Sequence, residues 1–584
     1  MVSSLHSHPL FYFLGGNRQR SDFLYVSTKT GLPLLYRWDD NLDEGELLTP
    51  GDEPIFPYAG AAAIHPSKPL VIFPKDKGGD VNYELFTLDY SRNVLEKITG
   101  PIGRIFYTFW VNDDEWIVVG HNQQTVYAKS LLRDGTMKDL YTTNEQILGA
   151  AYDSQRNLLT FSVGREGAKL VIIDITHPNH WQWVPEAGIP PFYPPSVYSE
   201  RGLLAYSIDK RTHQELVVRS IESLEEISRV RIPGFGFVEW VDESHLFGVI
   251  LDDGRLLPRI VDIHNGEWSP PLADLSGLFS TVTKDGPVWV ANSFLQPPFL
   301  QALRNGVVVN LIPPRSVAQD IRVENHHYQS FDGRSVQCWL LRNPNPKAPL
   351  VMYLHGGPTA IQGDWWYPEI PALAIAGFHV FAPNFRGSDG FGMEFRDLNI
   401  GDLGGGDLQD VRYGARYAME AVKTDRRPAL FGGSYGGYLT LQGLVTQPEA
   451  WSGGVAIAPT TDWKEDYNLS DSHYRKFCVH FFGGTPTERS DLYDDRSPIT
   501  HLKGLTKPLL ILHGENDTIT PLEPVKKFSA EAEKLGLPVQ LAITRDEGHG
   551  SLHSMNAIRD ITLTLEHLRT IFRTQIEAVI SQTA

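Results

Sequence analysis

Short strand-like runs rich in β-branched and aromatic residues recur through the first half of the chain at nearly constant spacing. The seven runs begin at residues 23, 70, 116, 158, 203, 246 and 288, and turn signals follow most of them. A period of about 40–50 residues with several strands per unit is typical of propeller blades. The spacing therefore predicts a seven-bladed β-propeller; a large pair of β-sandwiches with coincidental spacing is the alternative.

From about Arg322 the pattern changes to strands that alternate with helices, ending in a long helix over about residues 554–576. Such alternation predicts a mainly parallel sheet with helices on both faces, the arrangement of an α/β fold. We therefore expect a propeller over residues 21–315 and an α/β domain over residues 316–584. Residues 1–20 are expected to form an N-terminal extension, which could pack on the α/β domain.

The composition excludes several classes of protein. The 584 residues include 41% hydrophobic ones, enough for packed cores, and carry a formal charge of −18, which disfavours nucleic acid and anionic membranes as partners. Cys338 and Cys478 are too few for a disulfide framework and lack metal-ligand spacing. The N-terminus lacks the basic and apolar regions of a signal peptide. We expect a soluble cytoplasmic protein without a metal.

Ser434 lies between a predicted strand and a predicted helix and has glycines two residues before and two residues after it. A nucleophilic serine in such a turn is held in a strained backbone conformation, and the glycines let strand and helix approach closely. A Gly-x-Ser-x-Gly match alone is weak, but its place at a strand-to-helix junction strengthens it. Ser434 is therefore the predicted nucleophile.

A serine hydroxyl needs an adjacent base, and His549 is the best candidate because it lies in a glycine-bracketed loop after the strand predicted at 539–543. His513 lies at a strand end, where packing explains it, and His553 could cap the final helix. The order of the segments is that of an α/β-hydrolase, in which serine, acid and histidine follow one another along the chain.

A carboxylate should orient the histidine and stabilise its cation. Asp517 follows the strand predicted at 509–512 and is the favoured acid, whereas Glu515 and Asp546 are alternatives that solvated loop charge explains. An oxyanion intermediate also needs two N–H donors. We expect one from the backbone of Tyr435 and the second from Gly357, with Gly356 in reserve.

Taken together, the motifs resemble those of the prolyl oligopeptidase (S9) family of serine peptidases and, within it, the acylaminoacyl-peptidase branch. The matching segments are 355–358 (HGGP), 384–392 (NFRGSDGFG), 433–437 (GSYGG), 513–517 (HGEND) and 546–550 (DEGHG). The propeller repeat, which includes Gly78-Gly79-Asp80, extends the similarity more loosely across most of the chain.

The resemblance implies a propeller that restricts entry to short peptides and acyl-enzyme catalysis without metal or cofactor. Members of the acylaminoacyl branch carry an arginine in the active-site cleft, in a segment similar to residues 473–477. Arg475 is accordingly a candidate for positioning a substrate carbonyl or carboxylate; a surface or inter-domain ion pair is the alternative. Val81 stands where related propellers often carry an acidic residue, and the paired glutamates of dipeptidyl-peptidase relatives are not found.

The favoured hypothesis is a serine peptidase that hydrolyses acylaminoacyl- or aminoacyl-peptides. An esterase, amidase or acyltransferase acting on a small metabolite would use the same triad. A catalytically silent scaffold is a third reading, which the intact triad disfavours. The resemblance alone suggests a homo-oligomer, and the sequence does not give the preferred side chain.

Overall fold

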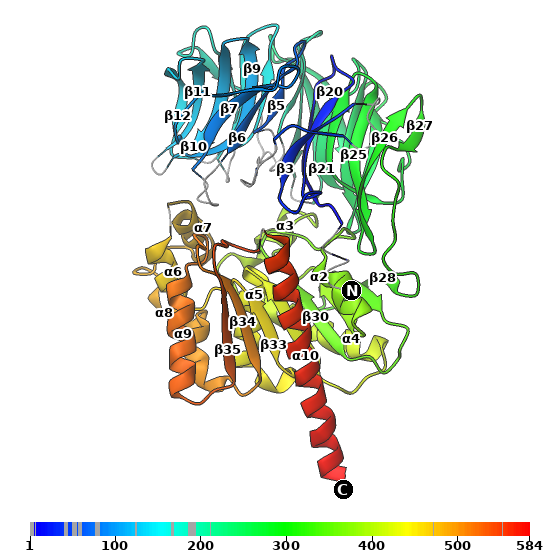
Figure 1. The fold of residues 1–584 in the computed structure, drawn as a ribbon, viewed down its shortest axis with the longest axis vertical. Helices are drawn as coiled ribbons and strands as arrows, with labels where there is room; N and C mark the ends of the chain where they lie inside the picture. The colour runs from blue at the N-terminus through cyan, green and yellow to red at the C-terminus, as the bar shows by residue number, and fades with distance from the viewer. Residues whose placement is uncertain are drawn as a thin grey trace. The chain divides into compact units, whose positions relative to one another are not determined.

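Seven antiparallel sheets follow one another along the first half of the chain, and each consists of consecutive strands (Figure 1). The computed structural model describes residues 5, 8–39, 45–49, 55, 61–75, 82–122, 125–145, 147–164, 169–184, 194–210, 212–470, 472–551 and 553–583. The seven sheets confirm the predicted seven-bladed propeller. Gly78-Gly79-Asp80 and Val81 lie outside the described residues.

The strands of the first four blades are β1 (Phe11–Gly16), β2 (Phe23–Ser27), β3 (Leu34–Trp38), β4 (Glu46–Leu47), β5 (Ala63–Ile64), β6 (Leu70–Lys75), β7 (Glu84–Asp89), β8 (Val94–Lys97), β9 (Arg104–Asn112), β10 (Glu115–His121), β11 (Val126–Leu132), β12 (Met137–Thr143), β13 (Ile147–Asp153), β14 (Leu158–Val163), β15 (Lys169–Asp174) and β16 (Trp181–Trp183). Those of the last three are β17 (Ser196–Tyr198), β18 (Leu203–Asp209), β19 (Gln214–Ser220), β20 (Glu226–Ile232), β21 (Phe235–Trp240), β22 (His245–Asp252), β23 (Arg255–Asp262), β24 (Ser276–Thr283), β25 (Gly286–Ser293), β26 (Gln296–Arg304) and β27 (Val307–Asn310).

The periodic runs in the sequence are the second strands of the blades: β2, β6, β10, β14, β18, β22 and β25. These strands are almost entirely buried, because neighbouring blades cover both of their faces. In outer strands such as β8 and β16 every residue is exposed, and no such apolar run occurs. The repeat can therefore be recognised in the sequence only at the buried second strand of each blade.

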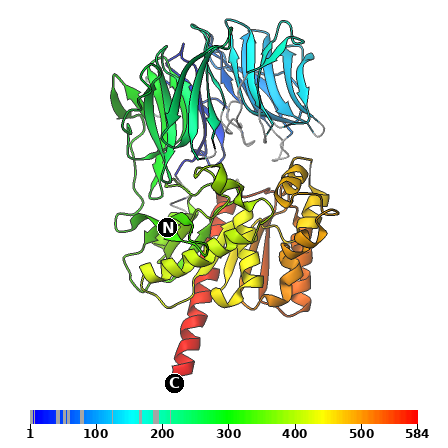
Figure 2. The same cartoon turned by 180° about the vertical axis from the view of Figure 1, so that it is seen from behind.

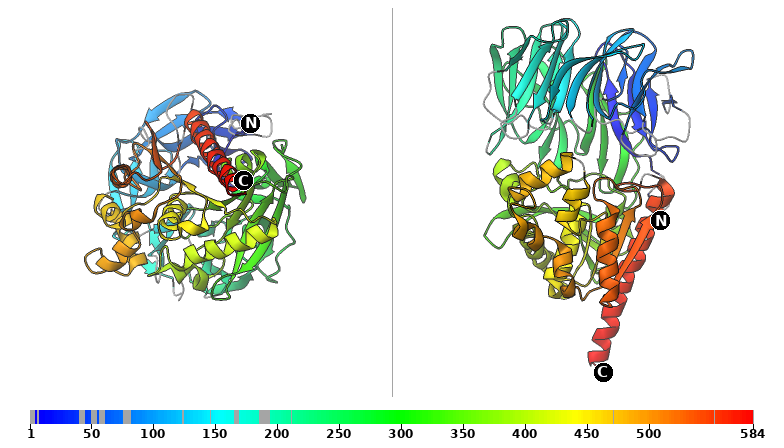
Figure 3. Two further views of the ribbon diagram at one scale, coloured as in Figure 1. Left: turned by 90° about the horizontal axis from the view of Figure 1, so that it is seen from below. Right: turned by 90° about the vertical axis from the view of Figure 1, so that its left-hand side faces the viewer.

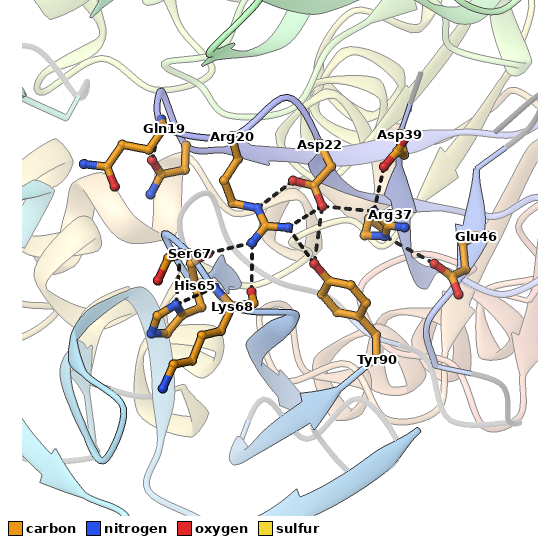
Figure 4. Close-up of polar contacts among 11 residues, drawn as sticks. Gln19, Arg20, Asp22, Arg37, Asp39, Glu46, His65, Ser67, Lys68 and Tyr90 are labelled. Atoms are coloured by element: carbon orange, nitrogen blue, oxygen red, sulfur yellow. Dashed lines mark hydrogen bonds and ion pairs between the residues drawn. The ribbon is translucent and has the colours of Figure 1, made fainter. Parts of the chain in front are cut away.

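Hydrogen bonds join the first blade to both of its neighbours, the seventh blade and the second. The Gly16 N–H on β1 donates to Thr281 Oγ1 on β24 at 2.8 Å. In the loop after β1, the Arg20 guanidinium binds both carboxylate oxygens of Asp22 at 2.6 and 2.8 Å and donates to the Tyr90 hydroxyl of the second blade at 2.7 Å (Figure 4). Because β1 pairs with β2, residues 11–16, predicted as part of an N-terminal extension, instead form the first strand of the first blade.

The chain divides into two compact units, a propeller unit over His8–Arg315 and a second unit that comprises Met1–Ser7 and Ser316–Ala584. The second unit contains one eight-stranded sheet in the order β28-β29-β31-β30-β32-β33-β34-β35. Pairing is parallel from β31 through β35 and antiparallel among β28, β29 and β31. This sheet is the predicted mainly parallel one of an α/β-hydrolase, and its antiparallel edge adds β28, which the sequence pattern did not reveal.

The strands of this sheet are β28 (Arg322–Gln329), β29 (Ser335–Arg342), β30 (Leu350–Leu354), β31 (His379–Pro383), β32 (Ala429–Gly433), β33 (Gly454–Ile457), β34 (Leu509–Gly514) and β35 (Val539–Thr544). The helices are α2 (Glu369–Ile375), α3 (Met393–Arg396), α4 (Gly406–Ala421), α5 (Tyr435–Thr446), α6 (Trp463–Leu469), α7 (Ser472–Phe482), α8 (Ser490–Asp495), α9 (Leu522–Lys534) and α10 (Ser554–Thr583).

Helices cover both faces of the sheet. Helix α10 crosses the face seen in Figure 1, and α4 lies across the opposite face, seen in Figure 2. The last turns of α10 extend beyond the end of the sheet (Figure 3). Among the described residues, no helix combines the length and the apolar character that crossing a bilayer requires.

Candidate active site

The turn between β32 and α5 carries Ser434 in a strained backbone conformation, with φ 54° and ψ −119°. Its N–H donates to the Ile457 carbonyl on β33 at 2.8 Å, which ties the turn to the neighbouring strand. At Gly436 an added Cβ would lie 2.0 Å from the Leu354 carbonyl oxygen, so only glycine permits this close approach of helix and strand. The local sequence thus places the Ser434 hydroxyl at the end of the parallel strands.

His549 lies between Ser434 and Asp517 and contacts both. Its Nε2 is 3.0 Å from Ser434 Oγ, and its Nδ1 is 2.8 Å from Asp517 Oδ2. The imidazole side chain is 21% exposed and the carboxylate is fully buried. With Nδ1–H donating to the carboxylate, Nε2 is the nitrogen that can accept the serine proton.

Asp517 is held by its own loop as well as by the histidine. Its carboxylate accepts the N–H groups of Ile519 and Thr520 at 2.9 and 3.0 Å and the Thr520 hydroxyl at 2.9 Å. Burial alone would raise the pKa of Asp517, but the hydrogen bond and charge of His549, the neighbouring His513 and the Thr520 N–H hold it below its ordinary value. The carboxylate is therefore ionised where it faces the imidazole.

The alternative residues have other surroundings. His513 is buried beside Asp517, and its Nε2 donates to the Thr520 carbonyl at 2.9 Å. Burial also lowers the pKa of His513. Glu515 and Asp546 are exposed loop carboxylates.

The backbone that could stabilise an oxyanion flanks Ser434. Tyr435 is the first residue of α5, so its N–H has no partner inside the helix. The segment after β30 passes beside the serine, because a Cβ added to Gly356 would lie 3.4 Å from Ser434 Cβ. Gly357 follows with φ 124°, a conformation that favours glycine. Both predicted donors thus come from segments that adjoin Ser434.

Two buried side chains, to which the sequence analysis gave no role of their own, support these donors. Asp407, at the start of α4, accepts the Tyr435 hydroxyl. His355 stacks on Phe385 with ring centroids 4.2 Å apart, and its Nε2 lies 2.9 Å from Ser388 Oγ. Burial lowers the pKa of His355 to about 4, so the ring is neutral at physiological pH.

Arg475 lies on α7 and is exposed. Its Nε donates to the Tyr467 carbonyl and its Nη2 to the Asn468 carbonyl, each at 3.1 Å. The guanidinium therefore caps the end of α6. These bonds hold the corner between the two helices, and no substrate role follows from them.

Comparisons with known proteins place the C-terminal domain among known peptidases. The model of the prolyl oligopeptidase family matches residues 366–575. The uncharacterized peptidase YuxL of Bacillus subtilis is 32% identical over 240 residues, which cover 39% of this chain and 35% of YuxL. Dipeptidyl-peptidase 5 of Schizosaccharomyces pombe is 27% identical over 54% of this chain and 48% of its own length. The acylamino-acid-releasing enzyme of Rattus norvegicus is 28% identical over 39% and 32%, respectively.

The matched regions thus span less than half the length of these relatives. Among solved structures, a puromycin hydrolase has a TM-score of 0.85 at 18% identity, with 98% of this chain and 96% of that chain covered. This likeness shows a shared fold. The match over residues 366–575 identifies the C-terminal domain as a peptidase domain of the prolyl oligopeptidase (S9) family.

Proposed function

We propose that the chain hydrolyses short acylaminoacyl- or aminoacyl-peptides through an acyl-enzyme intermediate on Ser434. The observation that carries the proposal is the hydrogen-bonded series from Ser434 through His549 to Asp517, with distances of 3.0 and 2.8 Å. A buried carboxylate, an imidazole and a hydroxyl in this order are what nucleophilic acyl transfer requires. The family match and the names of the relatives support a peptide substrate.

In the proposed reaction, Ser434 Oγ attacks the scissile carbonyl while His549 Nε2 takes the hydroxyl proton. Asp517 holds the Nδ1–H tautomer and stabilises the imidazolium that forms. The N–H groups of Tyr435 and Gly357 would bind the negative oxygen of the tetrahedral intermediate. His549 then returns its proton to the leaving amine, and a water molecule repeats the sequence to release the acyl group.

The experiment is a comparison of kcat/KM for the wild type and Ser434→Ala on four substrate classes: N-acetyl-aminoacyl anilides, free aminoacyl anilides, a dipeptidyl anilide and p-nitrophenyl esters. Selective cleavage of one anilide class that depends on Ser434 would support a peptidase and say whether the amino terminus must be blocked. Cleavage of the dipeptidyl anilide alone would favour a dipeptidyl-peptidase. Activity confined to esters would instead favour an esterase or acyltransferase that acts on a small metabolite.

We also propose that the propeller limits substrate size, as the family resemblance implies. A series of peptides with one fixed cleavable residue and increasing length tests this. The expected result is that kcat/KM falls steeply beyond a threshold length. Equal cleavage of short peptides and an unfolded protein would contradict the size limit and leave the peptidase proposal intact.

A further inference from the structure

The loop between β35 and α10 carries His549, and two side chains fasten it to the start of α10. Ser551 Oγ donates to the Asp560 carboxylate. Two residues before the histidine, Glu547 is only 1% exposed, although it is a charged residue in a surface loop. Burying a carboxylate costs free energy unless hydrogen-bond donors surround it. The position of Glu547 therefore requires donors close to its carboxylate.

Three donors converge on one oxygen of Glu547. Its Oε1 accepts the His553 backbone N–H at 3.0 Å, His553 Nδ1–H at 2.9 Å and the Asn556 side-chain amide at 2.7 Å. Hydrogen bonds to an ionised acceptor are about twice as strong as neutral ones. The carboxylate therefore clamps the histidine loop to the first turn of α10.

The backbone of the same residue ties the loop to the acid. The Glu547 carbonyl accepts the Asn516 N–H at 2.8 Å, and Asn516 immediately precedes Asp517. Glu547 thus touches the start of α10 with its side chain and the Asp517 loop with its main chain. From this geometry we infer that Glu547 is a positioning residue, which sets the distance of His549 from Ser434 and Asp517.

The inference rests on the proposed function, in which His549 is the general base. A displacement of about 1 Å at a reacting group can cost about 100-fold in rate. Because Glu547 is 1% exposed and would act through His549, its removal should lower kcat and leave KM nearly unchanged. We expect Glu547→Ala to lower kcat about 10- to 100-fold, with KM within about threefold of wild type.

The site also permits a chemical rescue. His553 and Asn556 line an open cavity of about 540 Å³ in the hydrolase domain. Glu547→Ala would leave both donors without their acceptor beside this cavity, where formate could bind in place of the lost carboxylate. Formate, compared with chloride at constant ionic strength, should raise kcat of this variant several-fold and saturably. It should not raise kcat of the wild type.

The variants are Glu547→Ala, Glu547→Gln and Asn556→Ala, and Glu566→Ala is the matched control because Glu566 is an exposed carboxylate farther along α10. Glu547→Gln keeps a carbonyl oxygen that can accept the three donors and should retain most of the activity. In a double-mutant cycle, Glu547→Ala and Asn556→Ala should be less than additive in kcat, because they remove the same bond. Thermal unfolding of each variant shows whether it is folded, and Glu547→Gln remains informative if Glu547→Ala is not.

Two results would overturn the inference. One is a kcat of Glu547→Ala within threefold of wild type. The other is a loss of kcat that is equally large in Glu547→Gln and that formate does not reverse in Glu547→Ala. Such a loss would indicate a general distortion of the domain. Failure of the proposed function is distinguishable, because wild-type protein would then neither turn over the substrates nor react at Ser434 with an organophosphonate.

Discussion

Gly514, the last residue of β34, marks the point where the histidine loop passes closest to the strand that precedes Asp517. A Cβ added to Gly514 would lie 2.0 Å from the Gly548 carbonyl oxygen and 2.6 Å from that of Glu547. Both contacts are with backbone, so neither can be relieved by rotation of a side chain. To reach 3.0 Å, below which real Cβ contacts essentially never occur, the two segments must separate by about 1 Å.

Such a separation would pull apart the two groups that the segments carry. His549 Nδ1 and Asp517 Oδ2 are now 2.8 Å apart, and an added 1 Å along this line would break their hydrogen bond. We expect Gly514→Ala to lower kcat/KM about 100-fold, which corresponds to about 2.7 kcal/mol of transition-state stabilisation. Overpacking should also lower the free energy of unfolding by about 1–3 kcal/mol.

The assay is kcat/KM on the best substrate of the panel, together with the rate of organophosphonate labelling at Ser434. Gly100→Ala is the control, because nothing lies within 4 Å of a Cβ at that exposed position. It should behave as wild type in both measurements. A Gly514→Ala variant with kcat/KM within threefold of wild type would refute the reasoning, since the loops would then have absorbed the methyl group without displacing His549.

Three further substitutions test ion pairs within each of the two domains. Asp410→Ala should lower the free energy of unfolding by about 3–5 kcal/mol, which urea unfolding measures. The reason is that the Arg386 guanidinium, only 7% exposed, loses the carboxylate of Asp410. Asp22→Ala should destabilise the propeller by a similar amount, which circular dichroism of its β signal under urea would follow. Arg342, whose guanidinium bonds Glu324, lowers the pKa of that carboxyl to about 2 from an ordinary 4.5. The stability advantage of wild type over Glu324→Gln should therefore be full above about pH 4.5 and shrink as the pH falls toward 2 in urea titrations, and an advantage that grew on acidification would contradict this.

The sequence was informative wherever a segment is buried on both faces. Such segments are continuous apolar runs, and this is why the second strand of each blade and β30, β32, β33 and β34 could be predicted. Half-exposed strands were less consistent: β28 has mostly exposed or half-buried residues and was not identified, whereas the mostly half-buried β35 was predicted. The first blade was also misplaced in part, because β1 pairs with β2 where an extension was expected.

Within the site, the predicted nucleophile, base and acid could be proposed from order and spacing, and the structure brings their side chains together. Their roles stay predictions until Ser434→Ala is assayed. His355 and Glu547 belong to predicted motifs and Asp407 does not, but the supporting contacts of all three could not be predicted, because the fold brings their partners to them. Arg475 was suggested by resemblance alone; its guanidinium binds the carbonyls at the end of α6, and its role toward a substrate stays a prediction.

The strand order explains why several contacts hold the loop that carries His549. Ser434 follows β32, Asp517 follows β34 and His549 follows β35, with β33 between the first two. In the parallel pairing of β34 and β35, Gly514 lies opposite Thr544, so both loops start at the same edge of the sheet. To stand between serine and acid, the histidine must therefore turn back across the end of β34. Gly514 permits this crossing, and we infer that the Glu547 clamp holds the loop in place once it has crossed.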